Sequence, residues 1–114
     1  MKKETENKLQ LIPKEEKYVD YMLNVIIRLP RTEKYSIGTE YKSSMYKMIE
    51  NTMYINKIKD NSQCLNIINK IDAELNTQRI FLRIMQKERW IDTKKFNVVM
   101  NLIYEIGKIY LEVL

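Results

Sequence analysis

Cationic side chains recur at helical spacing in the second half of the chain, where Arg79, Arg83 and Lys87 follow one another at intervals of four. Each step of four rotates the position on a helix by about 40°, so the three side chains form a slightly winding ridge. Such long cations can neutralise phosphate groups. They can equally complement the negative end of a helix dipole without any ligand. The predicted anion-binding ridge, continued across the next corner, comprises Arg79, Arg83, Lys87, Arg89, Lys94 and Lys95.

A second basic cluster, formed by Arg28, Arg31 and Lys34, surrounds Pro30. Residues 28–59 hold seven basic and three acidic side chains, and the whole chain has a formal net charge of +5. This balance permits a nucleic acid or another anionic partner without requiring one. The second cluster is therefore also a candidate nucleic-acid-binding surface.

The residues of common catalytic and metal sites are scarce. The chain has no histidine and a single cysteine, Cys64, which excludes an intrachain disulfide and a thiolate cluster for zinc. Asp72 and Glu74 are two residues apart and would lie on opposite sides of a helix, so they cannot form a carboxylate pair. We therefore expect no enzymatic activity, no catalytic residues, no metal site and no cofactor.

The elements that position these side chains are predicted to be helices, because two glycines and two prolines in 114 residues leave few turns. Pro30 forces the helix before it to stop. We predict helices at about 13–28, 36–57, 63–88 and 93–113, with residues 1–12 disordered or frayed and residues 13–114 forming one domain. Since every connection is short, the expected fold is all-α, an antiparallel up-down-up-down four-helix bundle.

Residues with a preference for helix ends mark two of these boundaries. Pro13 suits a first helical position, and Glu15 and Glu16 after it would complement the positive end of the helix dipole. Asp92 is a good N-cap candidate for the last helix, because its carboxylate can accept a hydrogen bond from a free backbone amide. We therefore expect the first helix to begin near Pro13 and the last near Asp92.

Apolar residues at alternating intervals of four and three predict the buried face of each helix. The first helix contributes Tyr18, Met22, Val25, Ile26 and Leu29. The second contributes Tyr41, Met45, Met48, Thr52 and Ile55, and the third Cys64, Ile68, Ile71, Leu75, Gln78, Leu82 and Met85. We expect Cys64 to be a small buried thiol rather than a reactive one.

The last helix has only a narrow polar seam, which includes Asn101 and Glu105. Its apolar surface is wider than one bundle needs, so the helix is either unusually buried within one chain or lies in a subunit interface, and we favour the interface. The second helix has a similarly widened apolar arc. The predicted oligomer interface comprises Val98, Leu102, Ile109, Ile49 and Met53. Because no apolar run is long enough for a membrane span or a signal peptide, we expect a cytoplasmic protein with no membrane partner.

Three stretches carry a resemblance to a known family: LPRTEKYSIG at 29–38, IDAELNTQRIFLRIM at 71–85, and the corner WID at 90–92 followed by YEIGK at 104–108. In this order and spacing the chain resembles a family of four-helix bundles. That family includes the accessory variability determinant proteins of diversity-generating retroelements and the proteins encoded in intervening sequences of 23S ribosomal RNA genes. The accessory branch is the more similar, from the Pro-Arg-Thr-Glu-Lys and Trp-Ile-Asp segments.

The resemblance implies a homopentamer with a basic surface. It further implies an accessory subunit that associates with the element's reverse transcriptase, binds RNA or DNA without sequence preference, and supports mutagenic copying of a template RNA. The scattered acids Glu40, Glu50, Asp72 and Glu74 depart from a strongly basic surface. The alternative is therefore an oligomeric four-helix scaffold, or a protein of the ribosomal intervening-sequence type, with protein partners only.

Overall fold

The computed structural model describes the backbone of residues 2–113 and the side chains of residues 11–112. Over the described backbone the chain forms the helices α1 (Lys2–Ile27), α2 (Arg31–Lys34), α3 (Ile37–Ile55), α4 (Asn61–Lys87) and α5 (Thr93–Val113), and no strand. The expected all-helical class and its four long helices are confirmed. No helix in this range has both the length and the apolar character that crossing a membrane requires.

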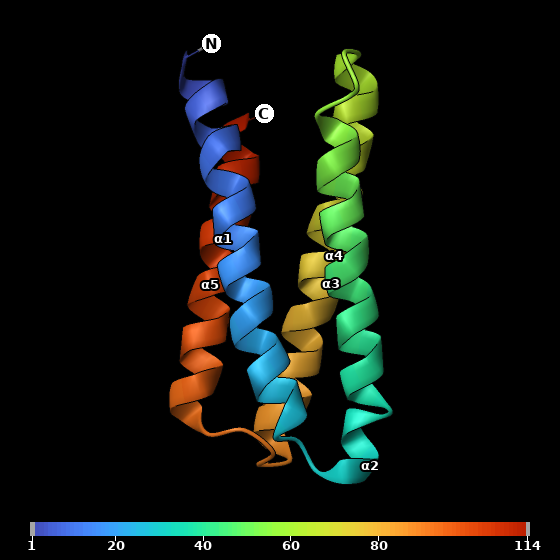
Figure 1. The fold of residues 1–114 in the computed structure, drawn as a ribbon, viewed down its shortest axis with the longest axis vertical. Helices are drawn as coiled ribbons and strands as arrows, with labels where there is room; N and C mark the ends of the chain where they lie inside the picture. Colours follow the sequence, from blue (N-terminus) through green and yellow to red (C-terminus); the bar gives the residue numbers. More distant parts are fainter. Residues whose placement is uncertain (1, 114) are drawn as a thin grey trace.

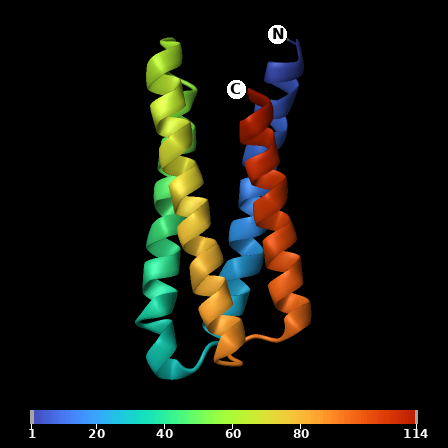
Figure 2. The ribbon, with the colours of Figure 1, turned by 180° about the vertical axis from the view of Figure 1, so that it is seen from behind.

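The four long helices lie side by side along the long axis of a body measuring 44 × 22 × 19 Å (Figure 1). α1 packs mainly on α5, α3 packs mainly on α4, and α4 also contacts α5. Both ends of the described chain lie at one end of the molecule, together with the α3–α4 connection (Figure 2). The α1–α3 link, which contains α2, and the α4–α5 corner lie at the opposite end.

The first helix begins earlier than expected. α1 starts at Lys2 and contains Pro13 in its interior, so the prediction that Pro13 is its first residue is wrong. Pro13 removes one backbone hydrogen bond, which a long helix can lose while the rest of its turns persist. Leu11, buried in the core, shows what the added turns contribute. The expected fraying of residues 1–12 concerns their behaviour in solution and stays a prediction.

The break at Pro30 is confirmed. α1 ends at Ile27, and the amide of Leu29 bonds to the carbonyl of Ile26 in a tightened last turn. Pro30 then stands at the N-cap of the short helix α2. The buried side chain of Leu29 fixes this link from one side. Gly38 fixes it from the other, because a Cβ atom there would lie 3.0 Å from Ile26 Cγ2 and 3.3 Å from the Glu33 carbonyl oxygen. The absent side chain therefore allows α3 to start directly against α1 and α2.

The apolar faces expected from the sequence form the core. Every residue of the three predicted faces is buried, including the polar Thr52 and Gln78, except Cys64, which is half-buried in the first turn of α4. α5 adds Val99, Ile103, Ile106, Ile109 and Tyr110. The unusual apolar content of α5 therefore serves in large part the core of the chain itself.

Candidate functional site

The fold brings the two predicted basic clusters to the same end of the molecule (Figure 1). One cluster lies on the link between α1 and α3, and the other on the last two turns of α4, the α4–α5 corner and the first turn of α5. We call this surface the basic end; its cations are Arg28, Arg31, Lys34, Arg83, Lys87, Arg89, Lys94 and Lys95. All are exposed except Lys34 and Lys95, which are half-buried.

The basic end holds the whole formal charge of the protein. The segments 28–36 and 83–95 contain eight basic residues and only the acids Glu33, Glu88 and Asp92, which gives a net charge of +5, equal to that of the entire chain. The rest of the molecule is therefore neutral overall. No cation of the basic end forms a salt bridge with a carboxylate among residues 11–112. An anion approaching this end thus meets cations that the chain itself does not neutralise.

Two of the three acids at this end are engaged with their own backbone or side-chain neighbours. Asp92 Oδ1 accepts a hydrogen bond of 2.7 Å from the amide of Lys95, which confirms the predicted N-cap of the last helix. Glu33 Oε2 accepts a hydrogen bond of 3.1 Å from the hydroxyl of Ser36. Both hydrogen bonds hold the connections that carry the cations.

Arg79 does not belong to the basic end. It lies eight residues, or roughly 12 Å of helix, before Lys87. Its Nη1 donates a hydrogen bond of 2.6 Å to Asn76 Oδ1, and its Nη2 would lie 3.6 Å from a Cβ atom built on Gly107 of α5. The half-buried guanidinium thus packs in the seam between α4 and α5. The predicted ridge is therefore divided. It rotates around α4, so Arg79 faces α5, whereas Arg83 and Lys87 are exposed to solvent.

The corner after α4 has an uncommon backbone. Arg89 has a φ of 64°, in the left-handed region that usually favours glycine. The amide of Trp90 bonds to the carbonyl of Met85, and the amide of Arg89 to that of Gln86, which together form a Schellman motif. An arginine thus stands at the position where helices most often end in glycine.

The predicted interface residues are distributed over three environments. Ile109 is 6% exposed and packs in the core of its own chain, which removes the reason for assigning it to an interface between copies. Val98 and Leu102 are half-buried in a groove between α1 and α5 that also contains Tyr21. Ile49 is half-buried, and only Met53, at 45% exposure, presents a large apolar surface.

A buried polar cluster joins α1, α3 and α5. The carboxyl group of Glu15, with the residue only 2% exposed, contacts the hydroxyl of Thr52 at 2.8 Å and accepts a hydrogen bond of 2.9 Å from the hydroxyl of Tyr110. Thr52 also donates to the carbonyl of Met48 and lies 2.5 Å from the Tyr110 hydroxyl. Burial raises the pKa of Glu15 to about 7. The expectation that Glu15 complements a helix N-terminus is wrong, because α1 begins thirteen residues earlier.

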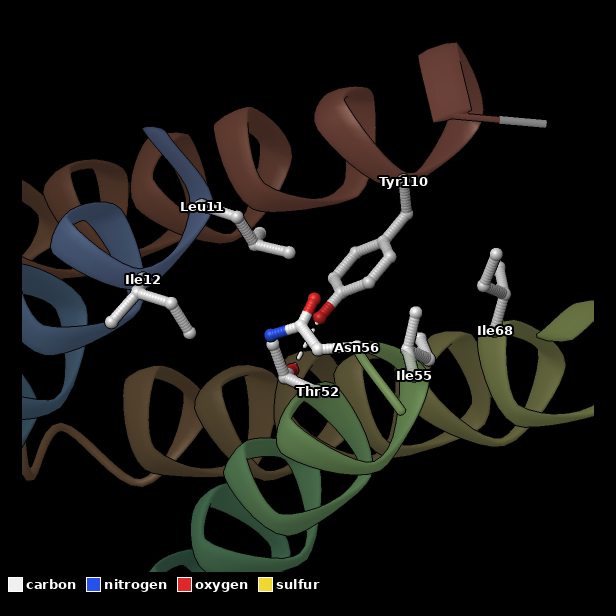
Figure 3. Close-up of a pocket in the computed structure, with 7 residues that line it drawn as sticks. All are labelled: Leu11, Ile12, Thr52, Ile55, Asn56, Ile68 and Tyr110. Carbon is white, nitrogen blue, oxygen red and sulfur yellow. Dashed lines mark hydrogen bonds between the residues drawn. The ribbon is translucent and has the colours of Figure 1, made fainter. Parts of the chain in front are cut away.

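Figure 3 shows Thr52 and Tyr110 of this cluster beside a pocket lined mainly by apolar side chains such as Leu11, Ile55 and Ile68. Its volume of about 20 Å³ suits a single water molecule and is far too small for a substrate or cofactor. The cluster therefore acts within the fold and does not form a ligand site.

A second buried cluster joins α1, α3 and α4. Tyr18 donates a hydrogen bond of 2.5 Å to Gln78 Oε1, and the Tyr41 hydroxyl lies 2.5 Å from that of Tyr18. Gln78 Nε2 donates to Ser44 at 2.9 Å. Burial raises the pKa of both tyrosines above the usual value, so the two hydroxyl groups remain protonated donors. This cluster fixes how the helices align, since a shift would leave buried polar groups unpaired.

Tyr35 is a surface residue that sequence reasoning missed. It follows α2 at the basic end and is 76% exposed, more than any other large apolar or aromatic side chain in the described range. The sequence could have indicated this exposure, because Tyr35 ends the polar run that begins at Arg31 and lies outside every predicted buried face. An aromatic ring among cations is a common feature of nucleic-acid-binding surfaces.

Comparison with known proteins gives two matches. A family model described as bAvd-like matches residues 8–112. A crystal structure of a protein with unknown function from the S23 ribosomal protein family of Bacteroides thetaiotaomicron is similar in fold, with a TM-score of 0.81 and 16% sequence identity over 97% of this chain and 96% of that one. Among curated proteins, no sequence matches this chain significantly.

Proposed function

Because the chain belongs to the bAvd-like family, we propose that it is a non-catalytic accessory subunit of a diversity-generating retroelement. In this role it associates with the element's reverse transcriptase and binds nucleic acid through the basic end. The bound nucleic acid is thereby held near the polymerase while a template RNA is copied with errors. The basic end does not recognise particular bases, so the subunit serves any template that the polymerase selects.

The observation that carries this proposal is the placement of cations where helix energetics oppose them. Lys87 stands in the last turn of α4, where a cation complements the helix dipole. Lys94 and Lys95 stand in the first turn of α5, where the dipole disfavours positive charge. Arg89 occupies a left-handed conformation that costs an arginine about 1–2 kcal/mol. Stability of the fold therefore accounts for Lys87 but not for Arg89, Lys94 and Lys95, whereas an anionic partner accounts for all four.

The proposed contacts are to phosphate groups rather than to base edges. The cations come from two separate connections and have long, flexible side chains. Such groups neutralise a phosphate backbone but offer no fixed pair of donors to a base in a groove. Binding is therefore expected to depend steeply on salt and weakly on sequence.

We further propose that the chain is an antiparallel up-down-up-down bundle that assembles as a homopentamer. Hydrogen bonds pair Glu15 with Thr52 and Tyr18 with Tyr41, so residue numbers rise along α1 as they fall along α3. The exposed Met53, beside the half-buried Ile49, provides apolar surface on α3 for a second copy. In a ring the basic ends are repeated by symmetry, and several weak contacts act together.

A pair of charge reversals tests nucleic-acid binding. Fluorescence anisotropy measures the Kd of the protein for a random-sequence RNA over a series of salt concentrations. We expect the double variant Arg83→Glu, Lys87→Glu to bind more weakly and to reduce the slope of log K against log salt by about 0.7–0.9 for each phosphate that the variant no longer neutralises. The control Lys57→Glu, Lys59→Glu makes the same charge change at the opposite end and should bind like the parent.

Equal weakening in both double variants would mean that net charge alone attracts RNA. Undiminished binding by the Arg83, Lys87 variant would refute the basic end as the site. A parent protein that binds no RNA at low salt, yet copurifies with coexpressed reverse transcriptase, would favour the scaffold with protein partners only. Failure to copurify with the polymerase would contradict the accessory role.

A further inference from the structure

Tyr35 has an exposure that the fold does not explain. Its ring is 76% accessible to solvent, and its hydroxyl forms no hydrogen bond to the described residues. Tyr35 therefore contributes little to the core or to its local turn. An exposed aromatic side chain of this kind is available to a partner.

The backbone under Tyr35 is well fixed. Tyr35 caps α2, whose amides Glu33 and Lys34 both bond to the carbonyl of Pro30, at 2.8 and 3.0 Å. Leu29 and Gly38 are buried on either side of this link. The position of Tyr35 relative to the helices is thus set before any ligand arrives, which reduces the entropic cost of binding.

The neighbours of Tyr35 are cationic. Arg31 and Lys34 lie within one helical turn of it, and Arg28 precedes them at the end of α1. The cations of the α4–α5 corner complete the same end of the molecule. Phosphate groups and an aromatic ring can therefore be engaged by one strand at the same time.

We propose that Tyr35 is a stacking platform for an unpaired base, and that the basic end consequently prefers single-stranded RNA or DNA to a duplex. This inference rests on the proposed nucleic-acid binding and specifies its substrate. In a duplex the bases are already paired and stacked, so a duplex offers the basic end only its phosphates. A single strand offers phosphates to the cations and a free base face to the ring.

Tyr104 provides an internal comparison. It is 64% exposed, close to the value for Tyr35, but lies in the middle of α5 between Asn101 and Lys108 and next to Glu105. Lys108 is the single cation within four residues of it along α5. Exposure is thus matched between the two tyrosines, and the charge around them is not.

The test uses one labelled RNA of mixed sequence without self-complementarity, alone and annealed to its complement. We expect the parent to bind the single strand more tightly. Tyr35→Ala should weaken single-strand binding by roughly 5- to 150-fold, the range that loss of one stacked base produces, and change duplex binding less than about twofold. Tyr35→Phe, which keeps the ring, should bind as the parent does, and so should Tyr104→Ala.

The outcomes separate this inference from the function on which it rests. If the parent binds RNA in a salt-dependent way and Tyr35→Ala weakens both forms equally or neither, stacking is refuted and phosphate binding stands. If the parent binds neither form, both proposals are overturned. Circular dichroism and light scattering on each variant show that a loss of binding does not come from a loss of fold or assembly.

Discussion

Glu15 is a carboxyl group held in the core, and it forms no salt bridge with a cation among residues 11–112. Its oxygens and the hydroxyl groups of Thr52 and Tyr110 form a cluster in which Thr52 also faces the carbonyl of Met48. When Glu15 is ionised, two hydroxyl hydrogens must serve all of these acceptors. When it is protonated, a third hydrogen allows Thr52 to donate to Met48 while the carboxyl group donates to Thr52. The neutral form is therefore the one that the buried site satisfies best.

This site predicts that the protein loses stability as pH rises. The pKa of Glu15 is raised from 4.5 to about 7 in the folded protein, so the folded state binds the proton more tightly than the unfolded state. Stability from this group is complete below about pH 4.5 and is lost as pH rises through 7, with a total on the order of 3 kcal/mol. Urea denaturation of the parent and of Glu15→Gln at pH 5 and pH 8 measures this pH-dependent part of the free energy of unfolding. Between pH 5 and pH 8 the free energy of unfolding of the variant should rise relative to that of the parent.

Glu16 provides the matched control, because it is adjacent, acidic and exposed. Glu16→Gln should follow the pH dependence of the parent. A stability difference between Glu15→Gln and parent that is the same at pH 5 and pH 8 would show that Glu15 does not titrate in this range.

At the scale of elements, the corner between α4 and α5 combines a tight helix end with a strained residue. The Schellman hydrogen bonds place Arg89 in the left-handed region, and Trp90 follows it against the core. Glycine adopts this conformation without steric cost. The corner thus accepts backbone strain and places a guanidinium at the basic end.

Replacing this arginine should move stability and binding in opposite directions. We expect Arg89→Gly to raise the free energy of unfolding by about 1 kcal/mol, because relief of the left-handed strain exceeds the added entropy of the unfolded chain. The same variant should bind RNA more weakly, since it has one cation fewer. Arg89→Ala removes the same charge and keeps the strain, so it should weaken binding without stabilising the fold. Equal stability of the glycine and alanine variants would contradict the strain.

For the whole molecule, the charged end and the exposed Met53 on α3 suggest two separate contacts. The cations lie at the end formed by α2 and the α4–α5 corner, whereas Met53 lies in the last turn of α3, near the opposite end. Assembly through α3 would therefore leave the basic end free. Binding of nucleic acid and association of copies should be separable by mutation.

Light scattering tests the assembly. The parent should have a mass near five times 13.8 kDa, and Met53→Lys should reduce it, because a buried unpaired charge opposes association. Tyr54→Lys is the control, since the next residue of a helix is rotated by about 100° and the side chain is also exposed. A parent that stays at 13.8 kDa at micromolar concentration would rule out the homopentamer.

The helices and their buried faces could be predicted from the amino-acid sequence alone. Apolar spacing identifies which side of a helix turns inward, and Pro30 ends a helix for local steric reasons, so Tyr18, Met45 and Leu82 could be placed in the core. The N-cap at Asp92 followed from the same local chemistry. The start of α1 could not be predicted in this way. Local rules place Pro13 at a helix start, whereas α1 begins at Lys2 and continues through Pro13.

Which distant residues meet became visible only in the folded molecule. Packing joined two basic clusters more than forty residues apart in sequence into one end, and it separated Arg79 from that end by placing it against α5. It also enclosed Glu15 between α3 and α5 and left Tyr35 exposed. Helical periodicity fixes the direction of a side chain around its own axis. Which neighbour covers it depends on how several helices pack together, and that arrangement is set by contacts far apart in the sequence.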